Sequence, residues 1–66
     1  MHRQIKGLTP REAGVADLVA EGLTNKEIGR RLGLSAETVK GYVSAVFRKL
    51  AVTSRYELIA QRRDTS

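Results

Sequence analysis

The stretch TNKEIGRRLGLSAETVKGYV, which covers Thr24–Val43, decides the fold of this 66-residue chain. Its spacing predicts two short helices joined by a tight turn at Gly33, because glycine adopts the left-handed conformation that ends a helix with little strain. Gly29 is small enough to let the second helix cross the first at a steep angle, where Leu34 and Val39 approach it. The stretch therefore predicts a helix-turn-helix motif.

Residues that cap helices mark where both helices of the motif begin. Thr24 is followed three residues later by Glu27, which is the spacing of a capping box. Ser35 has the side chain of an N-cap for the second helix, which is expected over about Ala36–Leu50. The motif therefore has a well-defined helix start on each side of its turn.

Another helix precedes the motif. The sequence TPRE at Thr9–Glu12 combines a threonine cap, a proline at the first helical position and a glutamate at the third. The helix is expected to end at Gly22, and Val15, Leu18 and Val19 share the face that it buries. This face can form a core with the apolar side chains of the motif.

A short fourth helix is expected over about 54–62. Either Thr53 or Ser54 can cap it, and Ser54 together with Glu57 would make a capping box. A segment of this length is marginal alone, so it must dock on the other helices, pair with a second copy, or do both. The chain is thus predicted to be all-α, a compact four-helix domain that contains the helix-turn-helix. The expected boundaries are a flexible segment at 1–7, the domain at 8–62 and a flexible tail at 63–66.

The composition argues against several classes of protein. The chain contains no cysteine, so neither disulfides nor a thiolate metal site can hold the fold, as suits a reducing cytoplasm. No apolar run approaches the roughly 20 residues that span a bilayer, and no signal peptide is visible. We therefore expect a soluble cytoplasmic protein with no membrane contact, no cofactor and no metal.

Positive charge is concentrated on the motif and on the residues that follow it. The net charge is +5, yet residues 1–23 carry three basic and three acidic side chains. Residues 24–63 carry nine basic side chains against three acidic ones. A polyanion would therefore bind most favourably to this second part of the chain. Charge alone is equally compatible with a solvated basic surface that binds no nucleic acid.

The two faces of the helix expected over 36–50 differ in character. At roughly 100° per residue, one narrow stripe is apolar and is predicted to be buried. It consists of Val39, Val43, Val46 and Leu50. The opposite face has no large apolar side chain and suits a DNA major groove, which admits one helix. It consists of Glu37, Lys40, Gly41, Ser44 and Arg48. Without the turn motif, an ordinary solvent-exposed face would be the better interpretation.

Several short motifs occur together in a specific order and spacing. They are LTPRE at 8–12, GLTNKEI at 22–28, LS at 34–35, TVK at 38–40 and KL at 49–50. Through them, residues 8–60 closely resemble the LuxR-type helix-turn-helix domain, also called the NarL/FixJ or GerE type. The resemblance implies a four-helical transcription regulator that binds double-stranded DNA sequence-specifically, with its third helix in the major groove. It also implies that the chain is the output domain of a response regulator or a small stand-alone regulator. Members of this type usually bind DNA as homodimers formed through the fourth helix, and RNA polymerase is a candidate partner.

The resemblance assigns roles to individual residues. The residues expected to read bases are Lys40, Gly41 and Ser44, to which we add Arg48 on the same helix face. The residues expected to contact phosphates are Thr24, Asn25, Lys26, Ser35, Thr38 and Lys49. Most of these lie at helix N-termini, where free N–H groups and the helix dipole attract anions. The residues expected at the dimer interface are Leu58, Ile59 and Arg62.

The chain departs from the family pattern at positions on or beside the expected recognition helix. Tyr42 replaces a common histidine, and Ala51 stands where glycine often ends the helix. Gly41 and Ser44 offer little side chain to a base edge, so direct readout depends mainly on Lys40. We therefore expect a less demanding sequence preference than is usual in the family.

Two alternative functions are compatible with the sequence. A small helical module that binds another protein needs an exposed apolar patch, and only Leu58 and Ile59 offer one. A promoter-binding domain of the sigma-factor type shares the TPRE start, although the GLTNKE run at 22–27 favours the LuxR type. An enzyme is not expected, because the only histidine is His2 and no nucleophile and base, or pair of carboxylates, share a helix face at a useful spacing.

Overall fold

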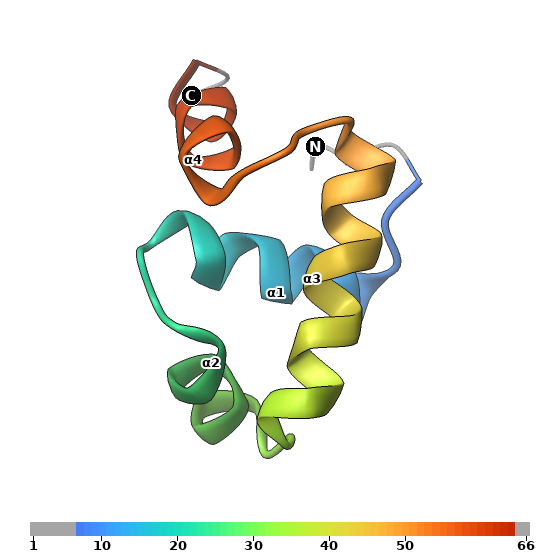
Figure 1. Ribbon diagram of the computed structural model, residues 1–66, viewed down its shortest axis with the longest axis vertical. Coiled ribbons are helices and arrows are strands. Elements are labelled where there is room, and N and C mark those ends of the chain that lie inside the picture. The colour runs from blue at the N-terminus through green and yellow to red at the C-terminus, as the bar shows by residue number, and fades with distance from the viewer. Residues whose placement is uncertain (1–6, 65–66) are drawn as a thin grey trace.

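Four helices form the part of the chain that the computed structural model describes, which is residues 7–64, with side chains up to Arg62. They are α1 (Pro10–Ala20), α2 (Asn25–Leu32), α3 (Ala36–Leu50) and α4 (Arg55–Asp64). The predicted all-α fold and the helix-turn-helix over α2 and α3 are confirmed (Figure 1). α4 continues to Asp64, beyond its predicted end near Arg62. Apart from Gly7 and the end of α4, the segments predicted to be flexible lie outside the described residues.

The other helices assemble on α1, which packs against α2, α3 and α4. Figure 1 shows α3 along one side of the molecule, with α2 beside its N-terminal end and α4 at the opposite end. The largest fully buried side chains come from all four helices and are Val15, Val19, Ile28, Val39, Val46 and Leu58. The buried stripes predicted for α1 and α3 are therefore confirmed, with Leu50 only half-buried.

Leu58 corrects the interpretation of α4. Its side chain is fully buried in the core of its own chain, so it is not available to a second copy. Ile59 is half-buried, whereas the Tyr56 side chain on the same helix is 83% exposed. α4 is therefore anchored through Leu58, and an interface formed by this helix must use other side chains.

Complete capping boxes begin α1 and α2, which confirms the predicted threonine cap of α1 and the predicted box of α2. In α1, the Glu12 N–H donates to Thr9 Oγ1 at 3.1 Å, and the Thr9 N–H donates to Glu12 Oε1 at 3.0 Å. In α2, the Glu27 N–H donates to Thr24 Oγ1 at 3.1 Å, and the Thr24 N–H donates to Glu27 Oε1 at 2.8 Å. Because a helix start leaves its first N–H groups without intrahelical partners, each such cap stabilises its helix by about 1 kcal/mol.

The cap of α4 differs from the predicted box. The Glu57 N–H donates to Ser54 Oγ at 3.2 Å, which is the expected first half. The Glu57 carboxylate, however, accepts from the N–H of Thr53 at 2.6 Å and from its hydroxyl at 3.1 Å. Thr53 therefore supplies the second half of the cap in place of Ser54, and both candidate caps are used.

Two glycines determine how α2 meets α3. Gly33 ends α2 in the left-handed conformation with φ of 73°, as the sequence predicts. The next residue, Leu34, donates its N–H to the Gly29 carbonyl at 2.8 Å. A Cβ atom added to Gly29 would lie only 2.4 Å from the Leu34 carbonyl oxygen, so the predicted close crossing at Gly29 is a contact with backbone.

Ala51 ends α3 in the left-handed conformation with φ of 57°, where an alanine Cβ is strained. We expect Ala51→Gly to raise the free energy of unfolding by about 1 kcal/mol, because relief of this strain exceeds the extra entropy of an unfolded glycine. Denaturant unfolding measures the change. The same substitution at Ala60, an exposed position inside α4, should lower stability by about 1 kcal/mol. A loss of stability at both positions would contradict the role of the Ala51 conformation.

Among residues 7–64, no helix has the length and apolar character needed to cross a membrane. Within the same range, no three side chains of His, Cys, Asp or Glu gather as metal ligands would. His2, the only histidine of the chain, lies outside this range.

Candidate nucleic-acid interface

The outward face of α3 is open to solvent along its length. The predicted members of this face, Glu37, Lys40, Gly41, Ser44 and Arg48, are all exposed. The opposite stripe is buried against the core, which prevents α3 from rotating about its axis. The face is therefore presented rigidly, with no large apolar side chain on it.

Two small residues, Gly41 and Ser44, occupy the middle of this face beside Lys40. Gly41 and Ser44 lie between Glu37, one turn before Gly41, and Arg48, one turn after Ser44. A Cβ atom at Gly41 would have no heavy atom within 4 Å, apart from its immediate helical surroundings, so packing does not require a glycine there. A partner could approach the α3 backbone closely at this point.

Glu37 also lies on this face, although no base-reading role was predicted for it from the sequence. Its carboxylate is exposed near the start of α3. A glutamate near the N-terminus of a helix stabilises the helix through a favourable interaction with its dipole. Its carboxylate can also accept a hydrogen bond from the N4 amino group of cytosine. Its place one turn before Gly41 was the signal that could have identified it.

The residues predicted to contact phosphates gather at two helix starts. At the start of α2, Thr24 and Lys26 are exposed and Asn25 is half-buried. At the start of α3, Ser35 and Thr38 are exposed, and the Ser35 hydroxyl donates to Thr38 Oγ1 at 2.9 Å. The Thr38 N–H in turn donates to Ser35 Oγ at 3.0 Å, which confirms Ser35 as the cap of α3.

Lys49 forms an ion pair with Glu12 of its own chain. Its ammonium group donates to Glu12 Oε1 at 2.9 Å, and the two side chains are 33% and 10% exposed respectively. This ion pair joins the end of α3 to the start of α1. The contact of Lys49 with DNA phosphates stays a prediction, and a phosphate would have to compete with Glu12 for the Lys49 ammonium group.

Hydrogen bonds hold two carboxylates of the caps in their charged form. The bond from the Lys49 ammonium, followed by the bond from the Thr9 N–H, lowers the pKa of Glu12 below its usual value. The N–H and hydroxyl of Thr24 lower the pKa of Glu27, with a smaller contribution from nearby arginine charges. Both caps are therefore fully formed at neutral pH.

The ion pair of Glu12 makes stability depend on pH. Since the folded-state pKa of Glu12 is lowered, its contribution is complete above the unfolded-state pKa of roughly 4.3 and is lost as pH falls through the folded-state value. We expect Glu12→Gln to reduce the loss of melting temperature between pH 7 and pH 3, measured by circular dichroism at constant ionic strength. Glu21→Gln, at an exposed position, serves as the matched control. A Glu12→Gln profile parallel to that of the parent would contradict this assignment.

Arg55, the first residue of α4, contacts the start of α2 and was not predicted as a site residue. Its Nη2 donates to the Leu23 carbonyl at 2.6 Å, and its Nη1 donates to Asn25 Oδ1 at 3.2 Å. These contacts join residues about thirty positions apart in the chain. No local pattern in the sequence marks such a contact.

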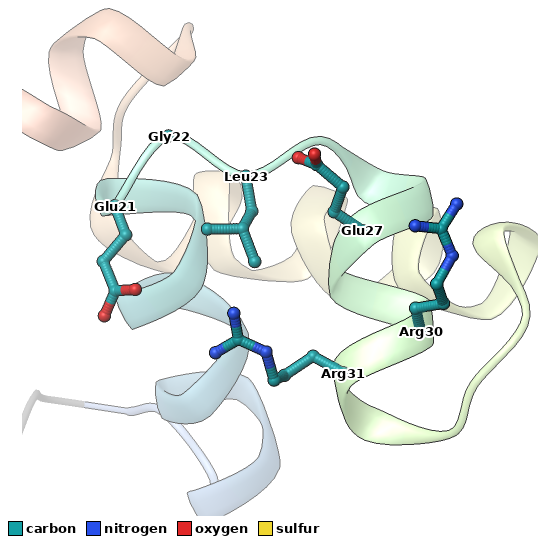
Figure 2. Close-up of a pocket in the computed structure, with 6 residues that line it drawn as sticks. All are labelled: Glu21, Gly22, Leu23, Glu27, Arg30 and Arg31. Carbon is teal, nitrogen blue, oxygen red and sulfur yellow. The ribbon is translucent and has the colours of Figure 1, made fainter.

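An open depression of about 660 Å³ lies between the end of α1 and α2. Its lining residues are Glu21, Gly22, Leu23, Glu27, Arg30 and Arg31. Figure 2 shows Arg31 reaching from α2 toward the end of α1, with the carboxylates of Glu21 and Glu27 on either side of Leu23. Two acids and two arginines give a mixed charge, so this depression suits a phosphate backbone less well than the face of α3.

The fold and the exposed face of α3 together define a DNA-binding domain of the helix-turn-helix class. The model of the luxR family of bacterial regulatory proteins, GerE, matches residues 6–61, and the chain belongs to this family. The function of this family is DNA-binding transcription regulation. Because the match is to the luxR family, it favours this function over the sigma-factor alternative.

Relatives with described roles agree with this assignment. The chain is 51% identical over 51 residues to the response regulator Rre1 of Synechocystis sp., covering 77% of this chain and 22% of the relative. It is 44% identical over 55 residues to the nitrate/nitrite response regulator protein NarL of Escherichia coli, covering 83% and 26%. It is 36% identical over 64 residues to the transcriptional regulatory protein DesR of Bacillus subtilis, covering 97% and 32%. The chain thus spans between about a fifth and a third of the length of these relatives.

Proposed function

We propose that this domain regulates transcription by inserting α3 into the major groove of double-stranded DNA. The observation that carries the proposal is the exposed face of α3, which is free of large apolar side chains and is held by a buried stripe on the other side. The residues that would meet base edges are Lys40, Gly41, Ser44 and Arg48. The residues that would meet phosphates are Thr24, Asn25, Lys26, Ser35 and Thr38.

Two copies would bind successive half-sites about 34–36 Å apart by pairing through α4. Since Leu58 is buried, the pairing surface consists of Tyr56, Ile59 and Ala60, of which Tyr56 and Ala60 are exposed. Arg62, which was also expected at the interface, forms an ion pair with Asp17 of its own α1. An exposed tyrosine at the start of α4 is the feature that supports pairing there.

The relatives support a proposal for the biological setting. Two of them are described as response regulators, and all are several times longer than this chain. The domain would accordingly act in the cytoplasm as the output part of a response regulator or as a small regulator of its own, with RNA polymerase as its further partner.

Salt-dependent binding tests the proposal directly. The chain is titrated into a labelled duplex of mixed sequence, and fluorescence anisotropy gives the affinity at several salt concentrations. A steep negative slope of log affinity against log salt is expected, since each neutralised phosphate contributes about −0.9 to it. Absence of binding even at low salt would overturn the proposal and favour a protein partner.

Single variants should distinguish contacts to bases from contacts to phosphates. Lys40→Ala is expected to weaken binding to the preferred site by about 1–3 kcal/mol, the range for a good base contact, and to relax the preference at one position. Lys26→Ala should weaken binding to every duplex alike and should make the salt slope less steep by about 0.9. Affinities for selected and scrambled duplexes at fixed salt measure both. Equal losses on all duplexes for both variants would contradict the division of roles.

A further inference from the structure

Arg55 reaches the α2 end of the proposed DNA interface from a different helix. Its guanidinium donates at the same time to the Leu23 carbonyl, 2.6 Å away, and to Asn25 Oδ1, 3.2 Å away. The Arg55 and Asn25 side chains are half-buried. The planar fork of an arginine side chain can hold two such acceptors in a fixed relation, which a lysine ammonium cannot reproduce. Arg55 therefore fixes the position of the α1–α2 loop relative to the first residue of α2.

The contact also determines which end of the Asn25 amide faces away from Arg55. A guanidinium group has donors only, so it must face the oxygen of the amide and not its NH2 group. With Oδ1 engaged, Nδ2 is turned away from Arg55 and keeps its two donors for another partner. A DNA phosphate has acceptors only, and Nδ2 is the chemical group that complements it.

We propose that Arg55 is a positioning residue for DNA binding, which orients the Asn25 amide so that its NH2 group faces a phosphate of the DNA backbone. The inference rests on the proposed phosphate contact at the start of α2. Arg55 itself does not contact the phosphate. Without Arg55, the amide is free to rotate, so ordering its NH2 group against the phosphate costs part of the binding free energy.

A double-mutant cycle between the two residues tests this role. Asn25→Ala is expected to weaken binding to a mixed-sequence duplex about tenfold or more, the effect of losing a hydrogen bond to a charged group. Arg55→Ala should cause a measurable but smaller loss, because the freed amide can still turn its NH2 group to the phosphate. The double variant should bind no more weakly than Asn25→Ala. Arg55→Lys should behave like Arg55→Ala, because it keeps the charge but not the fork. The proposal would be overturned if the affinity loss of the double variant equalled the product of the two single losses. It would also be overturned if Arg55→Lys bound DNA as tightly as the parent.

The salt slope distinguishes positioning from direct contact. If Arg55 only orients Asn25, Arg55→Ala leaves the slope unchanged; a slope less steep by about 0.9 would mean that Arg55 itself neutralises a phosphate, and the proposal would be wrong. Arg11→Ala, which removes an exposed arginine charge at the start of α1, controls for net charge. A steep slope for the parent chain supports the proposed function whatever the cycle shows, so the two conclusions can fail separately.

A further variant separates positioning from a loss of folding. Asn25→Asp keeps an oxygen for Arg55 but has no NH2 group, so it should fold like the parent and yet bind DNA more weakly than Asn25→Ala. All affinities are measured well below the melting temperature of each variant. An Asn25→Asp chain that folds and binds as tightly as the parent would overturn the proposal.

Discussion

Gly29→Val is expected to destroy the helix-turn-helix. A Cβ atom at this position would lie 2.4 Å from the Leu34 carbonyl oxygen, which is backbone and cannot turn aside. The two methyl groups of valine add to this overlap, and a β-branched residue also fits a helix less well than alanine. Overpacking of this kind costs about 3 kcal/mol or more. A domain of this size has only roughly 3–10 kcal/mol of stability, so most of the molecules should be unfolded or close to unfolding.

Thermal unfolding followed by circular dichroism measures this effect. Gly41→Val is the matched control, because Gly41 lies in α3 and a Cβ there meets no heavy atom within 4 Å outside its own helical turn. The control should melt at the same temperature as the parent or slightly higher, since valine is a better helix former than glycine. Similar losses in the two variants would mean that helix propensity, and not the crossing at Gly29, determines the result.

Leu58→Ala is expected to reduce the free energy of unfolding by about 2–5 kcal/mol, the range for truncating a buried leucine. The Leu58 side chain is fully buried within a single chain, where it anchors α4. The loss should therefore be the same at low and high protein concentration, because no second copy takes part in burying it.

Urea unfolding at protein concentrations that differ by a factor of ten or more tests this expectation. Tyr56→Ala serves as the control, because the Tyr56 side chain is 83% exposed and its loss should change monomer stability by less than about 0.5 kcal/mol. The same variant should weaken cooperative binding to a duplex with two half-sites, if α4 is the pairing helix. A loss for Leu58→Ala that appears only at high concentration would show that Leu58 belongs to an interface after all.

Features that depend on local chemistry could be predicted from the sequence. The caps at Thr9, Thr24 and Ser35 each involve residues three positions apart, and the left-handed end of α2 requires only Gly33. The close crossing at Gly29 was predicted from spacing as well, because the turn brings Leu34 back onto it.

Features that depend on how helices dock could not be predicted in the same way. Leu58 and Ile59 are neighbours in a short segment, and their order alone does not say which one faces α1. The ion pair of Lys49 with Glu12 and the contacts of Arg55 join residues 30 or more positions apart. A long charged side chain has several partners within reach, so the tertiary arrangement decides which of them it meets. The roles in base reading and phosphate binding remain predictions, since they require DNA.

The glycine in the middle of the outward face of α3 has a consequence for how this domain can evolve. No packing contact requires Gly41, and a helix is more stable with almost any other non-proline residue at an exposed position. A mutation there can therefore add a side chain to the exposed face of α3 without a compensating change elsewhere in the fold. Gly29, in the same motif, has no such freedom. If α3 binds DNA as we propose, descendants of this chain can acquire new target sequences through single changes at residue 41 while the scaffold stays as it is.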